Sequence, residues 1–468
     1  MSPTNVAHSN SVSQRPTRAR YWVIVFAVTL ATIQYVDRVA ISQAMPDIAK
    51  DLSLTDAQKG VVFSAFTLAY ALFEIPTGWL GDKMGARSVL MRVVVWWSVF
   101  TAATGWAWNY GSMLVMRFLF GAGEAGCFPN LTKALGAWLP KRDRTYAQAL
   151  MWMGARWGGA FAPLLVVCVM AFVTWRTAFM MFAVLGVIWA IAFYLWFRDD
   201  PRQHSAVNAA ELELLKENDA PTDGHANVPW RELASRPALW LLWAQYFCLS
   251  YGWYFYVTWL PTYLRDERGM EIKANAFMQL LGAGFEGAAA LFGGTLSPDL
   301  TQKLLAASLA GIPLFFGGFG SLIGGLIASR MIARGGAVTR VRRSIACVGF
   351  IGASTLLMTS FYIKDPLLAM LSMGLASFCN DMTMPGSWAT CMDIGGKYAG
   401  TVSGSMNMMG NFGGMAGPVV VGLILSSTNR DWQLAFLISS VIYVFAGVFW
   451  LFIDPVTPLL KTAEPARA

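Results

Sequence analysis

Residues 21–45 read YWVIVFAVTLATIQYVDRVAISQAM, an apolar run that is interrupted by an adjacent acid and base, Asp37 and Arg38. A helix needs about 20 mostly apolar residues to cross a bilayer, and this run is long enough. A charge at the bilayer centre costs roughly 2.5–3.5 kcal/mol, so it normally faces a partner or a water-filled cavity. The stretch therefore predicts a membrane-spanning helix with a functional charge pair inside it.

A second apolar run covers residues 113–139, which read MLVMRFLFGAGEAGCFPNLTKALGAWL, and Arg117 and Glu124 interrupt it. A buried carboxylate can bind and release a proton, so Asp37 and Glu124 are candidate proton carriers. Arginine stays charged and offers a planar fork that matches a carboxylate, so Arg38 is a candidate for holding an anionic substrate. The alternative is that the four charges form buried salt bridges that hold the two helices together.

The composition of the whole chain fits a membrane protein, because 56% of its 468 residues are hydrophobic and only 13% are charged. Twelve stretches are apolar enough and long enough to span a bilayer. They cover residues 21–45, 59–80, 88–107, 112–139, 146–170, 176–197, 238–264, 303–329, 344–362, 366–391, 398–425 and 432–453. We therefore predict an all-α membrane protein in which the first apolar run is an uncleaved helix.

The chain divides at its longest polar stretch, residues 198–236, with six predicted spans on each side. Short motifs of the first half recur in the second at a nearly constant offset. They are Gly158-Gly159-x-x-x-Pro163 with Gly413-Gly414-x-x-x-Pro418, Trp175-x-x-x-Phe179 with Trp432-x-x-x-Phe436, and Pro129 with Pro385. Any one match could reflect ordinary Gly and Pro packing in membrane helices. Together they predict two pseudo-symmetric six-helix bundles, residues 21–197 and 237–455, as in carriers whose halves rock around a central site.

Basic residues set the expected orientation, because Lys and Arg are retained on the cytoplasmic side of a membrane. Clusters follow the fourth and eighth spans, at residues 141–144 and 330–343. We therefore place both termini and the linker 198–236 in the cytoplasm, with a disordered tail at residues 1–20 and a second tail at 456–468. The same asymmetry accounts for the net charge of +8 without nucleic-acid binding. The six cysteines and three histidines show no spacing typical of a disulfide framework or a metal site.

The loop after the second span reads Gly78-Trp-Leu-Gly-Asp82-Lys83-Met-Gly85-Ala-Arg87 and resembles the loop motif of the major facilitator superfamily. Gly78 allows the close approach of a neighbouring helix, and Gly85 allows a tight turn. Asp82 can accept hydrogen bonds from a neighbouring helix terminus and from Arg87. These residues predict a clasp that holds one conformation closed on the cytoplasmic side.

Further motifs resemble the anion:cation symporter group of that superfamily. They are Tyr35-Val-Asp37-Arg38, Arg117-Phe-Leu-Phe-Gly121-Ala-Gly-Glu124-Ala-Gly-Cys-Phe-Pro129, Trp259-Leu-Pro261-x-Tyr263 and Asn407-x-x-Gly410-Asn411-x-x-Gly-Gly414. The resemblance implies the major facilitator fold and the proton-coupled import of a sugar acid or related organic carboxylate across a bacterial inner membrane. It implies no enzymatic activity and no cofactor besides protons, and it places Arg117 near the acid of the first helix, where it tunes protonation. We expect a monomer in the lipid bilayer.

One segment departs from this resemblance. Residues 276–302, between the seventh and eighth spans, look inserted on the periplasmic side, and they are apolar and rich in glycine. The insertion could form a re-entrant or lid-like hairpin, or it could lie on the lipid as a surface decoration.

Arg156 distinguishes this chain within the group. By the repeat offset it matches Asn411, so it would add a second cation beside the cavity and would suit a second carboxylate or a polyhydroxy acid. Alternatively, it pairs with an acid such as Glu74 or Asp381, or it lies nearer the cytoplasmic mouth of the cavity. The other side chains that we expect around a bound anion supply hydroxyl, amide or aromatic groups: Tyr35, Tyr70, Ser387, Trp388, Asn407 and Asn411.

Other functions compete with symport. Organophosphate:phosphate exchangers resemble this chain overall but use an arginine from each half, in spans one and seven, and residues 238–264 contain no basic residue. A transporter-like receptor or a membrane enzyme is a further alternative, but no attached signalling domain and no nucleophile constellation are visible in the sequence. The residues do not choose among sugar acids, aromatic carboxylates such as phthalate and small dicarboxylates such as tartrate.

Overall fold

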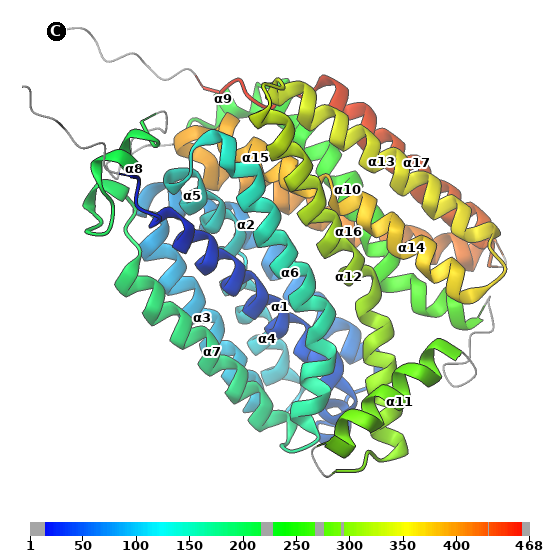
Figure 1. The fold of residues 1–468 in the computed structure, drawn as a ribbon. Coiled ribbons are helices and arrows are strands. Elements are labelled where there is room, and N and C mark those ends of the chain that lie inside the picture. The colour runs from blue at the N-terminus through cyan, green and yellow to red at the C-terminus, as the bar shows by residue number, and fades with distance from the viewer. Residues whose placement is uncertain (1–14, 217–227, 267–275, 292–293, 429, 461–468) are drawn as a thin grey trace, which may run out of the picture.

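The computed structural model describes residues 15–216, 228–266, 276–291, 294–428 and 430–460. Over these residues the chain folds into two bundles of long helices that lie side by side (Figure 1). The outer parts of both predicted tails, residues 1–14 and 461–468, and residues 217–227 of the predicted linker lie outside the described residues.

The first bundle contains the six predicted spans of the first half. Its helices are α1 (Arg20–Asp51), α2 (Asp56–Met84), α3 (Ala86–Gly105), α4 (Tyr110–Glu124), α5 (Cys127–Trp138), α6 (Lys141–Met170) and α7 (Trp175–Trp196). α4 and α5 form one span that breaks at Ala125 and Gly126. The cause is Pro129, which has no backbone N–H for the carbonyl of Ala125 and whose ring crowds that carbonyl.

The second bundle repeats this plan. Its helices are α10 (Pro237–Asp266), α12 (Pro298–Ala333), α13 (Val338–Tyr362), α14 (Pro366–Asp381), α15 (Met384–Gly395), α16 (Ala399–Ser427) and α17 (Trp432–Phe452). α14 and α15 form a span that breaks at Met382 and Thr383, just before Pro385. The predicted twelve-span, two-bundle architecture is therefore confirmed, with a proline-broken helix at the same place in each half.

The recurring Gly-Gly motif makes an equivalent contact in each bundle. A Cβ added to Gly158 of α6 would lie 2.9 Å from backbone atoms of Thr32 in α1. A Cβ added to Gly413 of α16 would overlap the carbonyl oxygen of Phe247 in α10. In each half the glycine lets the fifth span lie directly on the backbone of the first, which explains why the motif recurs.

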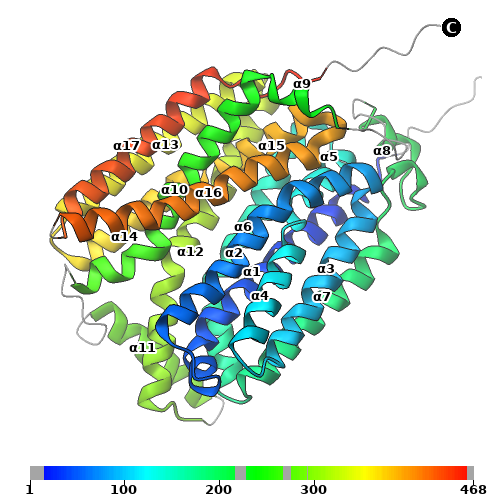
Figure 2. The same ribbon diagram turned by 180° about the vertical axis from the view of Figure 1, so that it is seen from behind.

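Short helices mark the two ends of the molecule (Figures 1 and 2). α8 (Ala209–Glu213) and α9 (Trp230–Ala234) lie at the end where the described chain begins and finishes, which we call the terminal end. α11 (Ala276–Leu291) lies at the opposite end, which we call the α11 end, and it packs against α12. Apart from residues 292–293, which lie outside the described residues, the predicted insertion consists of α11 and the start of α12.

The start of α1 is tied to α8. The backbone N–H of Thr17 donates to Asn208 Oδ1 at 3.2 Å, and Arg20 forms an ion pair of 2.9 Å with Glu211. Ordered structure therefore begins before residue 20, inside the segment that the sequence predicted to be a disordered tail.

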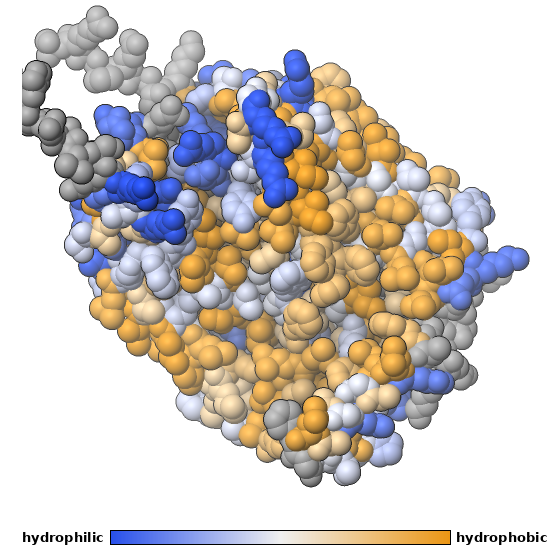
Figure 3. Space-filling model, in the orientation of Figure 1, coloured by the Kyte–Doolittle hydropathy of each residue, from blue (hydrophilic) through white to orange (hydrophobic). Residues whose placement is uncertain are grey.

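Apolar side chains cover the flanks of both bundles, and the hydrophilic residues gather mainly towards the terminal end in the view of Figure 3. Nine stretches of the described chain are long and apolar enough to cross a membrane, and one of them, Leu367–Ser427, covers the tenth and eleventh predicted spans. The span made of α4 and α5 and the helix α10 are not among these nine stretches. The exposed apolar flanks are the surface that a lipid bilayer would cover.

Candidate functional site

A polar cavity lies between the two bundles, halfway along the long helices. We call it the central cavity, and its volume is about 50 Å³. It is lined by Tyr35, Arg38, Tyr70, Phe128, Trp152, Arg156, Tyr246, Leu249, Ser250, Trp253, Tyr254, Met384, Asn407, Gly410 and Asn411. Six of these residues were predicted from the sequence to meet a bound anion: Tyr35, Arg38, Tyr70, Arg156, Asn407 and Asn411.

Arg38 of α1 is paired with Glu124, the last residue of α4. Arg38 Nη2 donates to Glu124 Oε2 at 3.3 Å, and the Glu124 side chain is fully buried. The Arg38 guanidinium also lies over the rings of Tyr70, 4.6 Å away, and Tyr35, 5.3 Å away. Its side chain keeps 22% of its surface exposed, so one edge of a fixed cation faces the cavity while the other meets a carboxylate.

Asp37 and Arg117 lie deeper than this pair, behind the cavity wall. Asp37 is 1% exposed, and neither of its carboxyl oxygens accepts a hydrogen bond of ordinary geometry. The charged groups nearest to it are Arg117 and Glu124. The Arg117 guanidinium packs over the ring of Phe120, 4.2 Å from its centre. Asp37, Arg38, Arg117 and Glu124 therefore form one buried cluster, with Arg38 at the cavity and Asp37 and Arg117 behind its wall.

Arg156 of α6 is paired with Asp381, the last residue of α14. Arg156 Nε lies 2.7 Å from Asp381 Oδ2, and Nη2 donates to Oδ1 at 3.0 Å. Arg156 Nη1 also donates to the Tyr35 hydroxyl at 3.2 Å, and its guanidinium packs 4.3 Å from the ring of Trp253. Of the alternatives that the sequence left open, the structure shows both the cavity position and the pairing with Asp381, and this pair bridges the two bundles.

Glu74 of α2 is a buried acid that the sequence suggested only as a possible partner of Arg156. It is fully buried and accepts hydrogen bonds from two amides of the other bundle, those of Asn407 and Asn411, the second at 3.0 Å. Asn407 Nδ2 also lies 3.4 Å from the hydroxyl of Tyr70, which lines the cavity. Glu74 could have been selected from the sequence by the criterion that selected Asp37, namely an acid inside an apolar span.

Ser387 and Trp388, predicted to contact the substrate, lie behind the cavity wall. Trp388 is fully buried and donates its indole N–H to the hydroxyl of Tyr246 at 2.8 Å. Ser387 donates to Gln245 Oε1 at 3.4 Å. In this arrangement Tyr246, which sequence reasoning did not select, is the group that faces the cavity, and Trp388 fixes the position of its hydroxyl.

The predicted clasp joins the two bundles at the terminal end. Asp82, near the end of α2, accepts hydrogen bonds from the backbone N–H groups of Gly400 and Thr401, at 3.0 and 2.6 Å, and from Lys133 at 3.2 Å. Gly400 and Thr401 begin α16, so the carboxylate lies where backbone donors are free and the helix dipole favours an anion. A Cβ added to Gly78 would overlap the carbonyl oxygen of Gly400, so the two helices meet there backbone to backbone.

The turn that follows Asp82 is held by the linker between the bundles. Gly85 adopts φ of +85°, a conformation that a residue with a side chain rarely takes. The backbone N–H of Arg87 donates to Asp199 Oδ1 at 3.0 Å, and burial raises the pKa of that Asp199 carboxyl. The Arg87 side chain donates to the carbonyl of Tyr194 at 2.6 and 3.1 Å, whereas the sequence predicted that it would bind Asp82.

A second cluster closes the terminal end between α6 and the other bundle. Asp393 of α15 lies 2.7 Å from Arg144 of α6 and 2.7 Å from Arg342 of α13. All three side chains are at most 7% exposed. With the Asp82 contacts, this cluster holds the halves together at the terminal end.

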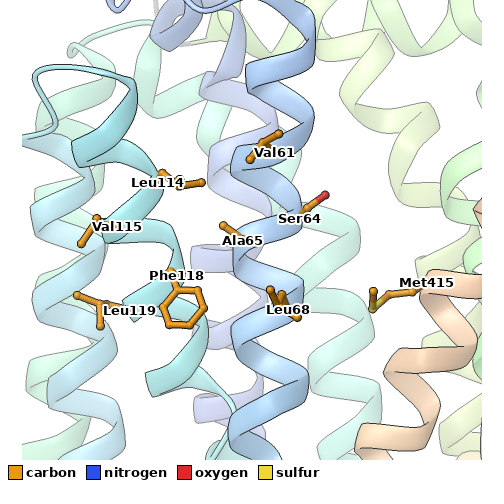
Figure 4. Close-up of a pocket in the computed structure, with 9 residues that line it drawn as sticks. All are labelled: Val61, Ser64, Ala65, Leu68, Leu114, Val115, Phe118, Leu119 and Met415. Carbon is orange, nitrogen blue, oxygen red and sulfur yellow. The ribbon is translucent and has the colours of Figure 1, made fainter.

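A larger cavity lies towards the α11 end but has the wrong chemistry for an anion. It measures about 580 Å³ and is lined by α2 and α4, with Met415 of α16 on the far side (Figure 4). Its lining offers one hydroxyl, that of Ser64, and otherwise apolar side chains. Leu68 and Val115 of this lining are about half exposed on the flank of the bundle, so the groove suits lipid chains rather than a charged solute.

The fold and the site together define a membrane carrier, two pseudo-symmetric bundles around a charged central cavity. Residues 27–418 match the family model of the Major Facilitator Superfamily, and the chain belongs to that family. The fold is also that of the fucose:proton symporter FucP of Escherichia coli, which covers 93% of this chain and 100% of its own at a TM-score of 0.65 and 15% identity. The protein is therefore a transporter and not an enzyme.

Relatives over nearly the whole chain transport organic anions according to their names. "Probable sulfoacetate transporter SauU" of Cupriavidus necator is 33% identical over 451 residues, which cover 96% of this chain and 97% of that one. "Probable galactarate/D-glucarate transporter GarP" of Escherichia coli is 29% identical, with 94% and 96% covered. The hexuronate transporter of Bacillus subtilis is 28% identical, with 91% and 92% covered. These relatives fit the anion:cation symporter group that the motifs indicated.

Proposed function

We propose that the protein is a proton-coupled symporter that imports an organic acid anion, a sugar acid or a related carboxylate or sulfonate, across a bacterial inner membrane. In this proposal the terminal end faces the cytoplasm, the α11 end faces the periplasm, and the protein works as a monomer with protons as its coupling ion. The names of the relatives support an organic anion as the substrate.

The observation that carries the proposal is the pair of Arg38 and Glu124 at the edge of the central cavity. A fixed cation is held 3.3 Å from a carboxylate that can take up a proton. When Glu124 is protonated, its attraction for Arg38 weakens, and the guanidinium can bind the carboxylate of a substrate instead. Proton binding and anion binding then support each other at one residue pair, which is the linkage that symport requires.

The charge balance of the buried centre supports coupling to a cation. Three arginines, at positions 38, 117 and 156, face four acids, at positions 37, 74, 124 and 381, all of them in the described spans. An anion that entered with every acid ionised would increase a negative excess in a poorly solvated place, at a cost of several kcal/mol. Protonation of an acid removes that excess, so the anion is expected to bind together with at least one proton.

The contacts at the terminal end provide the gate that alternating access needs. Asp82 and Asp393 both bond across the two halves there, and these bonds must break before the cavity can open on that side. We infer that the described arrangement is closed towards the cytoplasm. Release inside then follows when the halves separate at the terminal end and Glu124 loses its proton.

Uptake into proteoliposomes tests the proposal. The purified protein is reconstituted, a pH gradient that is acid outside is imposed, and uptake of labelled sulfoacetate, D-glucarate and D-glucuronate is followed with and without a protonophore. Accumulation of one of them that collapses with the protonophore is expected. Accumulation that follows a sodium gradient instead, or obligatory exchange for an internal anion without a gradient, would replace the proposal with sodium symport or with anion exchange.

Two variants separate proton coupling from anion binding. Glu124→Gln is expected to keep substrate exchange but to lose accumulation driven by the pH gradient, because the amide cannot carry a proton. Arg38→Ala is expected to weaken binding by about 2–4 kcal/mol, since the carboxylate loses a charge-assisted bond. Glu286→Gln in α11 and Arg92→Ala in α3 are matched controls, because both side chains are exposed and outside the cavity. Undiminished accumulation by Glu124→Gln would remove Glu124 from the proton path.

A further inference from the structure

The central cavity is flanked by two arginine–carboxylate pairs that occupy related places in the fold. Glu124 ends α4 and Asp381 ends α14, each at the proline-broken span of its bundle. Glu124 is paired with Arg38, and Asp381 with Arg156. Both arginines line the cavity and both belong to the first bundle. Arg38–Glu124 and Arg156–Asp381 are therefore two similar arginine–carboxylate pairs that flank the central cavity.

Tyr35 lies between the two arginines and limits how far apart they can be. The Arg38 guanidinium carbon lies 5.3 Å from the centre of the Tyr35 ring, and Arg156 Nη1 lies 3.2 Å from its hydroxyl oxygen. The distance from a phenol ring centre to its oxygen is about 3 Å. Laid end to end, these steps and the C–N bond of about 1.3 Å in Arg156 place the two guanidinium carbons at most about 13 Å apart.

Resting on the proposed function, we propose that Arg38 and Arg156 together bind a short organic dianion, one acidic group on each arginine. Each acidic group takes the place of the carboxylate that now pairs with that arginine, and Glu124 and Asp381 each take up a proton as they are displaced. The substrate class is a two- to four-carbon molecule with two carboxylates, or with a carboxylate and a sulfonate.

The spacing selects the length of the dianion. An arginine–acid contact takes up about 4 Å between the guanidinium carbon and the central atom of the acid, so at most roughly 5 Å remains between the two acidic centres. With C–C bonds of about 1.5 Å, acidic groups two or three bonds apart fit, whereas the ends of an extended six-carbon diacid do not.

The proton count follows from the charges. If a dianion displaced two ionised carboxylates, Glu124 and Asp381 would be left buried without cations, which costs several kcal/mol for each. If both are protonated, every arginine still faces one negative charge and the net charge of the site is unchanged. One dianion is then carried with two protons, and the step that loads the site moves no net charge.

Other charged and titratable groups surround the two pairs and contribute to the pH at which they protonate. Asp37, Arg117 and Cys127 lie near Glu124, and the hydroxyls of Tyr35 and Tyr246 lie near Arg156. Glu74, Tyr70 and Tyr254 face Arg38. None of them occupies the bonding edge of either arginine in place of Glu124 or Asp381, so the proton count is expected to come from those two acids.

Binding to the purified full-length protein tests the two-arginine site. Isothermal titration calorimetry is performed with sulfoacetate and L-tartrate as dianions, and with glycolate and D-glucuronate as monoanions. The wild-type protein is expected to prefer the dianions. Arg156→Gln is expected to weaken sulfoacetate binding about 100-fold and D-glucuronate binding less than about threefold, because only the dianion uses the second cation. Equal losses for both classes, or no loss, would overturn the proposal.

Proton uptake during binding supplies a second readout. The calorimetric titration is repeated in buffers with different ionisation enthalpies, which gives the protons taken up for each sulfoacetate bound. About two are expected for the wild-type protein, and about one for Asp381→Asn and for Glu124→Gln, because each amide resembles the protonated acid. A wild-type count of one that Asp381→Asn leaves unchanged would show that Asp381 is only a structural partner of Arg156.

A charge-balanced double variant guards against misfolding. If Arg156→Gln alone unfolds because Asp381 loses its cation, Arg156→Gln combined with Asp381→Asn removes both charges and leaves a neutral amide at each position. The double variant is expected to bind D-glucuronate like the wild type and sulfoacetate about 100-fold more weakly. Proton-driven uptake of a monoanion with no preference for dianions would refute this inference and leave the proposed function intact. No binding or uptake of any organic anion would refute both.

Discussion

Replacement of Asp82 by alanine should open the terminal end of the carrier. The Asp82 carboxylate accepts two backbone hydrogen bonds, from Gly400 and Thr401, and both cross from one bundle to the other. Hydrogen bonds to a charged group contribute about 1.5–3 kcal/mol each, so the lower value gives about 3 kcal/mol for the pair. These bonds exist only while the terminal end is closed. Their loss should therefore shift the equilibrium between closed and open forms by about 100-fold.

Spin labels on the two bundles would measure this shift. Arg142 of α6 and Arg340 of α13 are exposed at the terminal end, and both can be changed to cysteine in a protein from which the exposed Cys168 has been removed. Double electron–electron resonance should show mainly a short distance in the parent protein. A long component of comparable population should appear after Asp82→Ala. The matched control is Lys83→Ala, which changes the exposed neighbouring residue.

The reasoning is refuted if Asp82→Ala leaves the distance distribution unchanged while the protein remains folded, because the two bonds would then contribute nothing to closure. It is also refuted if Lys83→Ala produces the same long component. In that case the general charge of the loop, and not the bonds to the start of α16, would set the equilibrium.

Three further predictions concern buried positions. Glu74→Gln should tighten binding of the anion about tenfold in titrations at neutral pH, because it removes a negative charge that lies directly behind Asn407 and Asn411 in the cavity wall. Weaker binding would contradict the charge balance proposed above. Asp393→Asn should lower the free energy of unfolding by about 3 kcal/mol in thermal melts, because two buried arginines lose their carboxylate partner. The control Asp143→Asn, nearer the surface, should change the free energy of unfolding by less than about 1 kcal/mol. Gly78→Ala should reduce the uptake rate at least about tenfold, because the added Cβ meets the carbonyl oxygen of Gly400. In the control Gly60→Ala the added Cβ has open space around it, so the uptake rate should stay within about twofold of the wild-type rate.

The local features of this chain were readable from the sequence because they depend on residues close together along it. Apolar length predicts spans, so the twelve-span plan follows from the order of the residues. Pro129 and Pro385 could be matched as repeat positions, but only the structure shows that the helices break there, since Pro46, Pro76 and Pro163 lie inside unbroken helices. The charges inside spans also stand out without a fold, which is why Asp37 and Glu124 could be identified as candidates. The same criterion applied to every span would have included Glu74.

The choice of partners was decided by the tertiary structure. Arg38 and Glu124 are 86 residues apart, and Arg156 and Asp381 are 225 apart in different bundles, so no local pattern states which acid meets which arginine. A helix that turned by one residue about its axis would move a side chain by about 100° and change its neighbour. The rotation of each helix about its axis therefore decides which side chains reach the cavity. Trp388 lies behind the cavity wall, and Tyr246 faces the cavity. The sequence determined that charges are buried in this membrane protein, and the packing of the helices determined which of them meet.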